Sequence, residues 1–205
     1  MNDRDKPEIV VFDLGGVLID WDPRHLYRKM FDDESEMDRF LAEICSTGWN
    51  LQMDRGMPFE EGVAALSRQH PEMSAYIEAF WKRWPEMIEG AIDGTVDILE
   101  SLHGKGVPLF ALSNWSAQTW PYARDRFKFL NLFEGLVISG FEGTMKPEKA
   151  IFNILLERYA IDPRDAVFID DRAENIAVAE TFGIHGIRFS SPAKLSIDLA
   201  RHGLL

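Results

Sequence analysis

The stretch IVVFDLGGV at residues 9–17 decides the fold class of this chain. Its first four residues are apolar and predict a buried strand, and the two glycines predict a tight turn soon after it. The sequence therefore predicts that Asp13 lies at the C-terminal end of a strand. Ligands of open α/β sheets bind at this end of the strands, so Asp13 is placed like a nucleophile.

Four further segments have the character of buried strands. They span residues 107–112, 135–138, 166–169 and 186–189, and segments with apolar residues at helical spacing separate them. Strands that alternate with helices in this way are typical of a parallel sheet covered by helices. The sequence therefore predicts an α/β fold.

Residues 20–90 interrupt this alternation. The segment reads as helical, with no convincing strand, and is broken at Gly56-Met57-Pro58 and His70-Pro71. Because it follows the first strand directly, we expect it to lie over the carboxyl edge of the sheet. The predicted domains are a core formed by residues 1–19 and 91–205 and a helical cap formed by residues 20–90.

Composition limits the possible partners and compartment. The 205 residues carry 22 Lys and Arg against 34 Asp and Glu, a net charge of −12, which repels nucleic acids and anionic membranes. No apolar stretch approaches the length of a membrane span, and the mixed charges of residues 1–6 do not resemble a signal peptide. Cys45 is the only cysteine, which excludes an internal disulfide and favours a reducing cytoplasm.

Polar side chains follow successive predicted strands: Asp13, then Ser113 and Asn114, then Lys146, then Asp170 and Asp171. A parallel sheet brings such positions to one edge. Several carboxylates that converge there require a cation, and an oxygen-rich cluster suits Mg²⁺. Taken singly, each residue also fits an ordinary role as a helix cap, a turn residue or a solvated charge. Their order along the chain favours a shared site.

The strings that carry this pattern are VFDLGGV at 11–17, LSN at 112–114, KP at 146–147 and FIDDRAEN at 168–175. They resemble those of the haloacid dehalogenase-like (HAD) superfamily, in its phosphatase branch with a helical cap. Within it the chain is similar to bacterial sugar phosphatases of the glucose-1-phosphatase type. The resemblance covers nearly the whole chain and implies a three-layer, Rossmann-like parallel sheet with an inserted α-helical cap.

The resemblance also implies a nucleophile and a metal site. Asp13 would attack phosphorus and form an aspartyl phosphate. The Mg²⁺ ligands would be Asp13, the backbone carbonyl of Gly15, Asp171 and, directly or through water, Asp170.

The same resemblance implies the substrate contacts. Ser113 would hydrogen-bond a phosphoryl oxygen, and Lys146 would neutralise charge on the nucleophile and the phosphoryl group. Asn114 is expected to contribute to substrate binding, Trp115 to line the pocket, and Asn175 to have a structural role.

Gly15 departs from the superfamily pattern, which usually has a second aspartate at this position. That aspartate protonates the leaving oxygen and then activates water, help that is typically worth 10²–10⁴-fold in rate. Three explanations are open. The leaving group is a good one, another group such as Asp20 or Asp22 supplies the proton, or the protein binds phosphate more than it turns it over. The segment at residues 49–56 faces either the substrate or solvent.

The leading hypothesis is a Mg²⁺-dependent phosphatase that acts on a small phosphorylated metabolite, such as a sugar phosphate, as a monomer or homodimer. One alternative is a metal-free 2-haloacid dehalogenase, which Gly15 permits but the pair Asp170-Asp171 disfavours. The other is a catalytically weak protein that binds a phosphorylated ligand.

Overall fold

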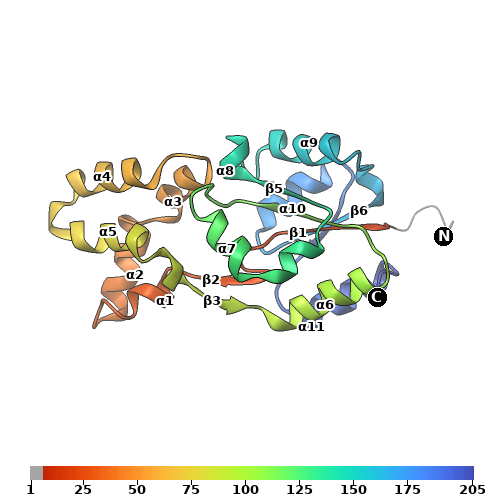
Figure 1. Ribbon diagram of the computed structural model, residues 1–205, viewed down its shortest axis with the longest axis horizontal. Helices are drawn as coiled ribbons and strands as arrows, with labels where there is room; N and C mark the ends of the chain where they lie inside the picture. Colours follow the sequence, from red (N-terminus) through yellow and green to blue (C-terminus); the bar gives the residue numbers. More distant parts are fainter. Residues whose placement is uncertain (1–6) are drawn as a thin grey trace.

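Five parallel strands form the central sheet of this protein, whose computed structural model describes residues 7–205. The strands are β1 (Ile9–Phe12), β4 (Leu109–Ser113), β5 (Gly135–Ile138), β6 (Ala166–Asp170) and β7 (His185–Arg188). Their order in the sheet is β5-β4-β1-β6-β7, so β1 lies in the middle (Figure 1). All five predicted strands are confirmed, with ends within two residues of those expected. The expectation that residues 1–6 are not a signal peptide concerns residues that lie outside the described part of the chain.

Helices cover both faces of this sheet. One face packs against α6 (Asp93–Gly104) and α11 (Pro192–Arg201), and the other packs against α9 (Lys149–Arg158) and α10 (Ala173–Glu180). The shorter core elements are α7 (Trp120–Arg126), α8 (Ser139–Glu142) and the 3₁₀ turns Lys128–Leu132 and Pro163–Asp165. The predicted three-layer, Rossmann-like α/β fold is therefore confirmed.

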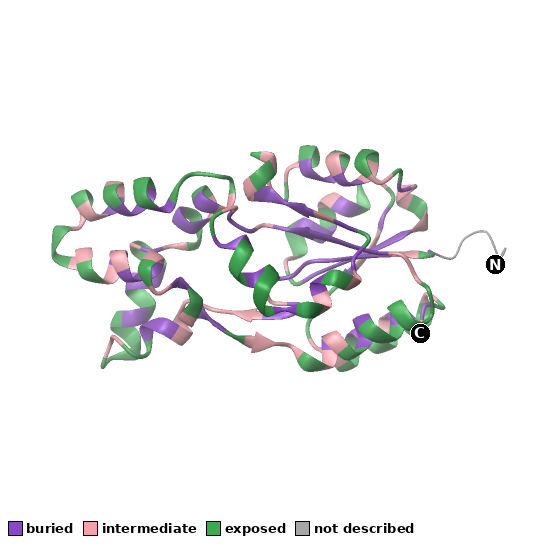
Figure 2. Cartoon of the chain, viewed as in Figure 1, coloured by how far each residue is buried: buried purple, intermediate pink, exposed green. Residues whose placement is uncertain are grey.

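The three central strands, β4, β1 and β6, read as nearly continuous apolar runs because both of their faces are buried. Side chains alternate along β1: Val10 and Phe12 join the cluster that includes α6 and α11, and Val11 joins the cluster that includes α9 and α10. Every residue of β4 and β6 is buried (Figure 2). Because all pairings in this sheet are parallel, the carboxyl ends of its strands lie at one edge.

The helices inserted after β1 lie beyond that edge (Figure 1). They are α1 (Arg24–Tyr27), α2 (Glu34–Glu43), α3 (Thr47–Asp54), α4 (Phe59–Gln69) and α5 (Ser74–Lys82), followed by the 3₁₀ turn Trp84–Met87. We call residues 22–87 the cap. Its interior is aromatic, with Phe59 stacked on Trp81 and Trp49 packed edge-on against Phe80. No helix within residues 7–205 is long and apolar enough to cross a membrane.

A two-stranded antiparallel ribbon joins the core and the cap. It consists of β2 (Ile19–Trp21) and β3 (Ile88–Ala91). The expectation that residues 20–90 contain no strand was wrong at both ends of that segment. Strands of three and four residues are too short to show an alternating pattern, and Asp20, Glu89 and Gly90 further obscure it. Both connections to the cap pass through this ribbon.

Candidate active site

A buried lysine bridges two aspartates at the carboxyl edge of the sheet. Lys146 Nζ lies 2.9 Å from Asp13 Oδ1 and 2.7 Å from Asp170 Oδ2. The three residues are 1%, 7% and 0% exposed, respectively. Asp13 directly follows β1 and Asp170 ends β6, so two neighbouring strands present their carboxylates to a single ammonium group. The structure thus brings together three of the predicted site residues.

Hydrogen bonds from neighbouring residues hold the Lys146 backbone and the Asp170 carboxylate in place. Asn114, directly after β4, donates from Nδ2 to the Lys146 carbonyl (2.9 Å) and accepts at Oδ1 from the Lys146 amide (2.8 Å). Asn175 Nδ2 lies 3.0 Å from both oxygens of Asp170, and the Arg172 amide donates to Asp170 Oδ1. The structural role expected of Asn175 is confirmed. Asn114 fixes the loop that carries the lysine.

The glycine turn after Asp13 allows a third carboxylate to approach. Gly16 has φ +73°, and a Cβ built there would lie 2.9 Å from Asp171 Oδ2, so a side chain at this position would collide with that carboxylate. Asp13, Asp170 and Asp171 each offer an oxygen within 4.8 Å of the others. A cluster of carboxylate oxygens with an exposed member suits Mg²⁺, which prefers oxygen ligands and retains waters. The residues present fit the expected ion.

Burial and repulsion by neighbouring carboxylates raise the pKa values of Asp13 and Asp171. Burial raises the pKa of Asp13 to about 7, with Lys146 opposing the shift and the neighbouring aspartates adding to it. The pKa of Asp171 is raised by burial and by Asp170. Burial alone would lower the pKa of Lys146, but Asp13 and Asp170 raise it above its usual value, which keeps the ammonium charged. One buried cation therefore faces three acids, and the site favours a further cation.

The remaining predicted substrate residues lie close by. Ser113 ends β4 with its side chain buried, and its Oγ has no hydrogen-bond partner within residues 7–205. An orphaned hydroxyl of this kind is suited to a ligand oxygen or a water. Trp115 is buried and lines a small cavity of about 60 Å³, which Gly15 and Asn114 also line.

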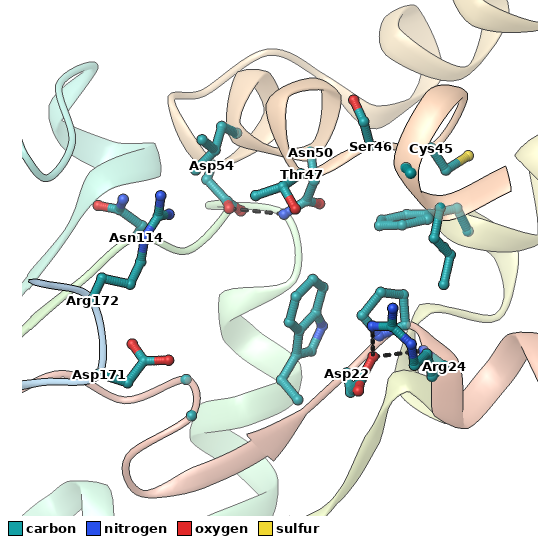
Figure 3. A pocket seen from close by; sticks show the side chains of 18 of the residues that line it. Asp22, Arg24, Cys45, Ser46, Thr47, Asn50, Asp54, Asn114, Asp171 and Arg172 are labelled. Atoms are coloured by element: carbon teal, nitrogen blue, oxygen red, sulfur yellow. Dashed lines mark hydrogen bonds and ion pairs between the residues drawn. The ribbon is translucent and has the colours of Figure 1, made fainter. Parts of the chain in front are cut away.

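A larger cavity of about 500 Å³ opens between the sheet edge and the cap. Its core side includes Asp13, Asn114, Lys146, Asp171 and Arg172. Its cap side combines polar and apolar groups. Figure 3 labels Asp22, Arg24, Cys45, Asn50 and Asp54, and the cavity is also lined by Asp38, Leu41 and Phe80. The Asp13 carboxylate therefore faces a space large enough for a small metabolite.

The two acids suggested to replace the group missing at Gly15 have other partners. Asp20 pairs with His25, with 3.0 Å between Oδ1 and Nε2, and does not line the cavity. Asp22 lines the cavity, but its Oδ1 accepts the Arg24 amide at the start of α1. Sequence reasoning instead overlooked Asp54, at the end of α3. Its only signal was its place within the mixed polar segment at residues 49–56.

Several hydrogen-bonded contacts hold the cap against the core near this cavity. Ser139 Oγ donates to the carbonyl oxygen of Asp54 at 2.5 Å. Arg55 and Glu148 form an ion pair. The Phe59 amide donates to Gln118 Oε1 at 2.6 Å. These contacts place the end of α3 directly over the sheet edge.

Comparison with known proteins identifies the family. The family model for haloacid dehalogenase-like hydrolases matches residues 7–183. The chain belongs to the haloacid dehalogenase-like hydrolases. The predicted family and its enzyme class, a hydrolase, are thereby confirmed.

Individual members of this family are similar along nearly their whole length. The sesquiterpene phosphatase of Aspergillus oryzae is 24% identical over 92% of this chain and 93% of its own. The phosphorylated carbohydrates phosphatase of Thermotoga maritima is 27% identical over 88% and 83%. A HAD family enzyme from Bacteroides thetaiotaomicron, solved in complex with magnesium and inorganic phosphate, has a TM-score of 0.68 and 26% identity over 90% and 95% of the two chains.

Proposed function

We propose that this hydrolase is a Mg²⁺-dependent phosphatase that cleaves a small phosphate monoester through an aspartyl-phosphate intermediate on Asp13. The observation that carries the proposal is the Asp13 carboxylate, held 2.9 Å from a buried ammonium and open to a cavity of about 500 Å³. Phosphoryl transfer depends chiefly on positioning and charge neutralisation, and this arrangement supplies both.

Each residue of the cluster has a role in this proposal. An oxygen of Asp13 attacks phosphorus, and Lys146 neutralises charge on both reacting groups. Ser113, whose hydroxyl has no partner among the described residues, donates to a phosphoryl oxygen. Asn114 positions the lysine loop and Trp115 lines the adjoining space.

The proposed metal ligands are Asp13, Asp170, Asp171 and the carbonyl of Gly15, supported by the clustering of the three carboxylates. Bound there, Mg²⁺ would neutralise the carboxylates and the phosphoryl oxygens. The Bacteroides enzyme with magnesium and phosphate supports this assignment.

We further propose a sugar phosphate as the substrate. The cap side of the cavity offers Asp22, Asp38 and Asn50, which can accept hydrogen bonds from hydroxyl groups. The Thermotoga relative is a phosphatase of phosphorylated carbohydrates. Leu41 and Phe80 line the same cavity, and the Aspergillus relative is a sesquiterpene phosphatase, so an apolar phosphate is the appropriate competitor.

The test is phosphate release from a panel of sugar phosphates, nucleotides, an aryl phosphate and a long-chain alkyl phosphate, with Mg²⁺ or with EDTA. We expect metal-dependent turnover that favours sugar phosphates and is lost in Asp13→Asn. A faster reaction with the long-chain alkyl phosphate would reverse the substrate assignment. Halide release from 2-chloropropionate without metal would instead establish the dehalogenase. Phosphate-ligand binding without turnover would establish the binding protein.

The cell compartment and assembly are also part of the proposal. The lone Cys45 is buried, and burial raises the pKa of its thiol to about 12, so it stays protonated at neutral pH. We propose a cytoplasmic enzyme with no nucleic-acid or membrane partner, as a monomer or homodimer. Light scattering on the purified protein measures the assembly state.

A further inference from the structure

We propose that Asp54 of the cap supplies the proton-transfer group that Gly15 lacks, so that the general acid and base of this enzyme comes from the cap rather than from the turn after the nucleophile. The inference rests on the proposed phosphatase function and adds a catalytic residue to it. Three observations carry it: the empty space beside Gly15, the position of Asp54 at the wall of that space, and the contacts that hold the side chain and the backbone of Asp54.

The space beside Gly15 is open. A Cβ built at this glycine meets no atom within 4 Å. The small cavity of about 60 Å³ at this point is lined by both Gly15 and Asp54. Asp54 also lines the larger cavity that contains Asp13 and Asp171. The carboxyl group of the cap therefore shares the space that a side chain at position 15 would enter.

One hydrogen bond holds the Asp54 carboxyl and another holds its backbone. Asn50 Nδ2 donates to Asp54 Oδ2 at 2.9 Å from one turn earlier on α3 (Figure 3). On the core side, Ser139 anchors the Asp54 backbone through a 2.5 Å hydrogen bond. Asn50 is itself 8% exposed, and its Oδ1 has no partner within residues 7–205, so it is available to accept a hydrogen bond from a ligand hydroxyl. These contacts hold Asn50 and Asp54 at the wall of the cavity that contains Asp13.

Charge around Asp54 suits a group that both gives and takes a proton. Burial raises the pKa of Asp54 to about 7, the Ser116 amide opposes the shift, and Asp13 adds to it. The other charged groups that line the same cavity are Lys146, Asp171 and Arg172 on the core and Asp22, Arg24 and Asp38 on the cap. A carboxyl that titrates near neutral pH is best matched to acid–base work there.

The proposed reaction has two chemical steps. As an oxygen of Asp13 bonds to phosphorus, the bond from phosphorus to the leaving oxygen breaks, and the Asp54 carboxyl gives that oxygen its proton. The Asp54 carboxylate then takes a proton from the water that attacks phosphorus. The bond between Asp13 and phosphorus breaks, inorganic phosphate leaves, and Asp54 is protonated again.

The decisive variant is Asp54→Asn, which keeps the size of the side chain and removes its acid. With a sugar or alkyl phosphate we expect kcat to fall by about 10²–10⁴-fold. With p-nitrophenyl phosphate, whose leaving group needs little protonation, the first turnover should remain fast. A burst of one nitrophenol per enzyme should then precede slow steady turnover as the phosphoenzyme accumulates. The matched control is Glu61→Gln, an exposed cap carboxylate outside both cavities, which should behave like wild type.

Rescue separates a chemical role from a structural one. The double variant Gly15→Asp with Asp54→Asn should regain much of the lost kcat, because the added carboxyl enters open space next to Asp13. An Asp54→Asn enzyme with unchanged kcat and pH profile for alkyl phosphates would overturn the inference, and so would a double variant as slow as Asp54→Asn alone. The proposed function fails on a different result, namely no phosphoenzyme and no phosphate from the wild type.

Discussion

Replacing Lys146 with methionine removes the cation between Asp13 and Asp170 and keeps a side chain of similar length. Two hydrogen bonds between charged groups are lost, at 2.9 and 2.7 Å, within a site that is at most 7% exposed. Such bonds contribute about 1.5–3 kcal/mol each, and breaking a buried ion pair costs about 3–5 kcal/mol. We therefore expect the free energy of unfolding to fall by about 3–5 kcal/mol at pH 8, measured by urea denaturation without Mg²⁺.

The pH dependence of this loss tests its cause. Because the pKa of Asp13 is raised to about 7, the wild-type carboxyl is charged and paired with Lys146 at pH 8 but mostly protonated at pH 5, so the ammonium contributes less through Asp13 at pH 5. The loss at pH 5 should therefore be smaller than the loss at pH 8. Lys128→Met, at an exposed lysine, is the control and should change stability by less than about 0.5 kcal/mol. A Lys146→Met loss below about 1 kcal/mol, or one equal at both pH values, would refute the reasoning.

Three further substitutions test other parts of the site. Asn114→Ala removes both hydrogen bonds to the Lys146 backbone, so unfolding free energy should fall by about 1–3 kcal/mol and kcat should fall with it, as measured by urea denaturation and steady-state kinetics. Ser139→Ala removes the hydrogen bond to the Asp54 carbonyl, which is worth about 0.5–1.5 kcal/mol. We therefore expect KM to rise roughly 2- to 12-fold in steady-state kinetics. An unchanged KM would show that this contact does not hold the cap closed. Asp13→Asn should become more stable relative to wild type as pH rises from 5 to 8 in thermal melts without metal. The folded Asp13 binds a proton more tightly than the unfolded one, so the wild type loses stability as pH rises towards 7; a difference that is flat with pH would contradict this.

Most of the sheet was predictable because its central strands are buried on both faces. Such strands read as uninterrupted apolar runs, and their parallel packing brings polar residues that follow them to one edge. Asp13, Lys146 and Asp170 come together for that reason. The ribbon of β2 and β3 escaped detection because three or four residues carry too little pattern.

The cap side of the cavity was not predictable from local pattern. Asp54 reaches the site through the packing of α3 on the core, and no motif in the sequence specifies that docking. Asp20 and Asp22, which are nearer to Asp13 along the chain, turn out to pair with His25 and to accept the Arg24 amide. Distance along the sequence is a poor guide once an insertion folds back over a sheet edge.

The ribbon of β2 and β3 makes the cap an exchangeable module. Because the chain leaves the core at Trp21 and returns at Ile88, beside the point of departure, an insert of different length or sequence could occupy this place without altering the order of the five parallel strands. The core would keep Asp13 and Lys146, while a new insert would supply different cavity-lining residues and a different proposed proton donor. If Asp54 acts as proposed, an exchange of the cap would change substrate choice and acid–base chemistry together, while the proposed phosphoryl transfer would stay with the sheet.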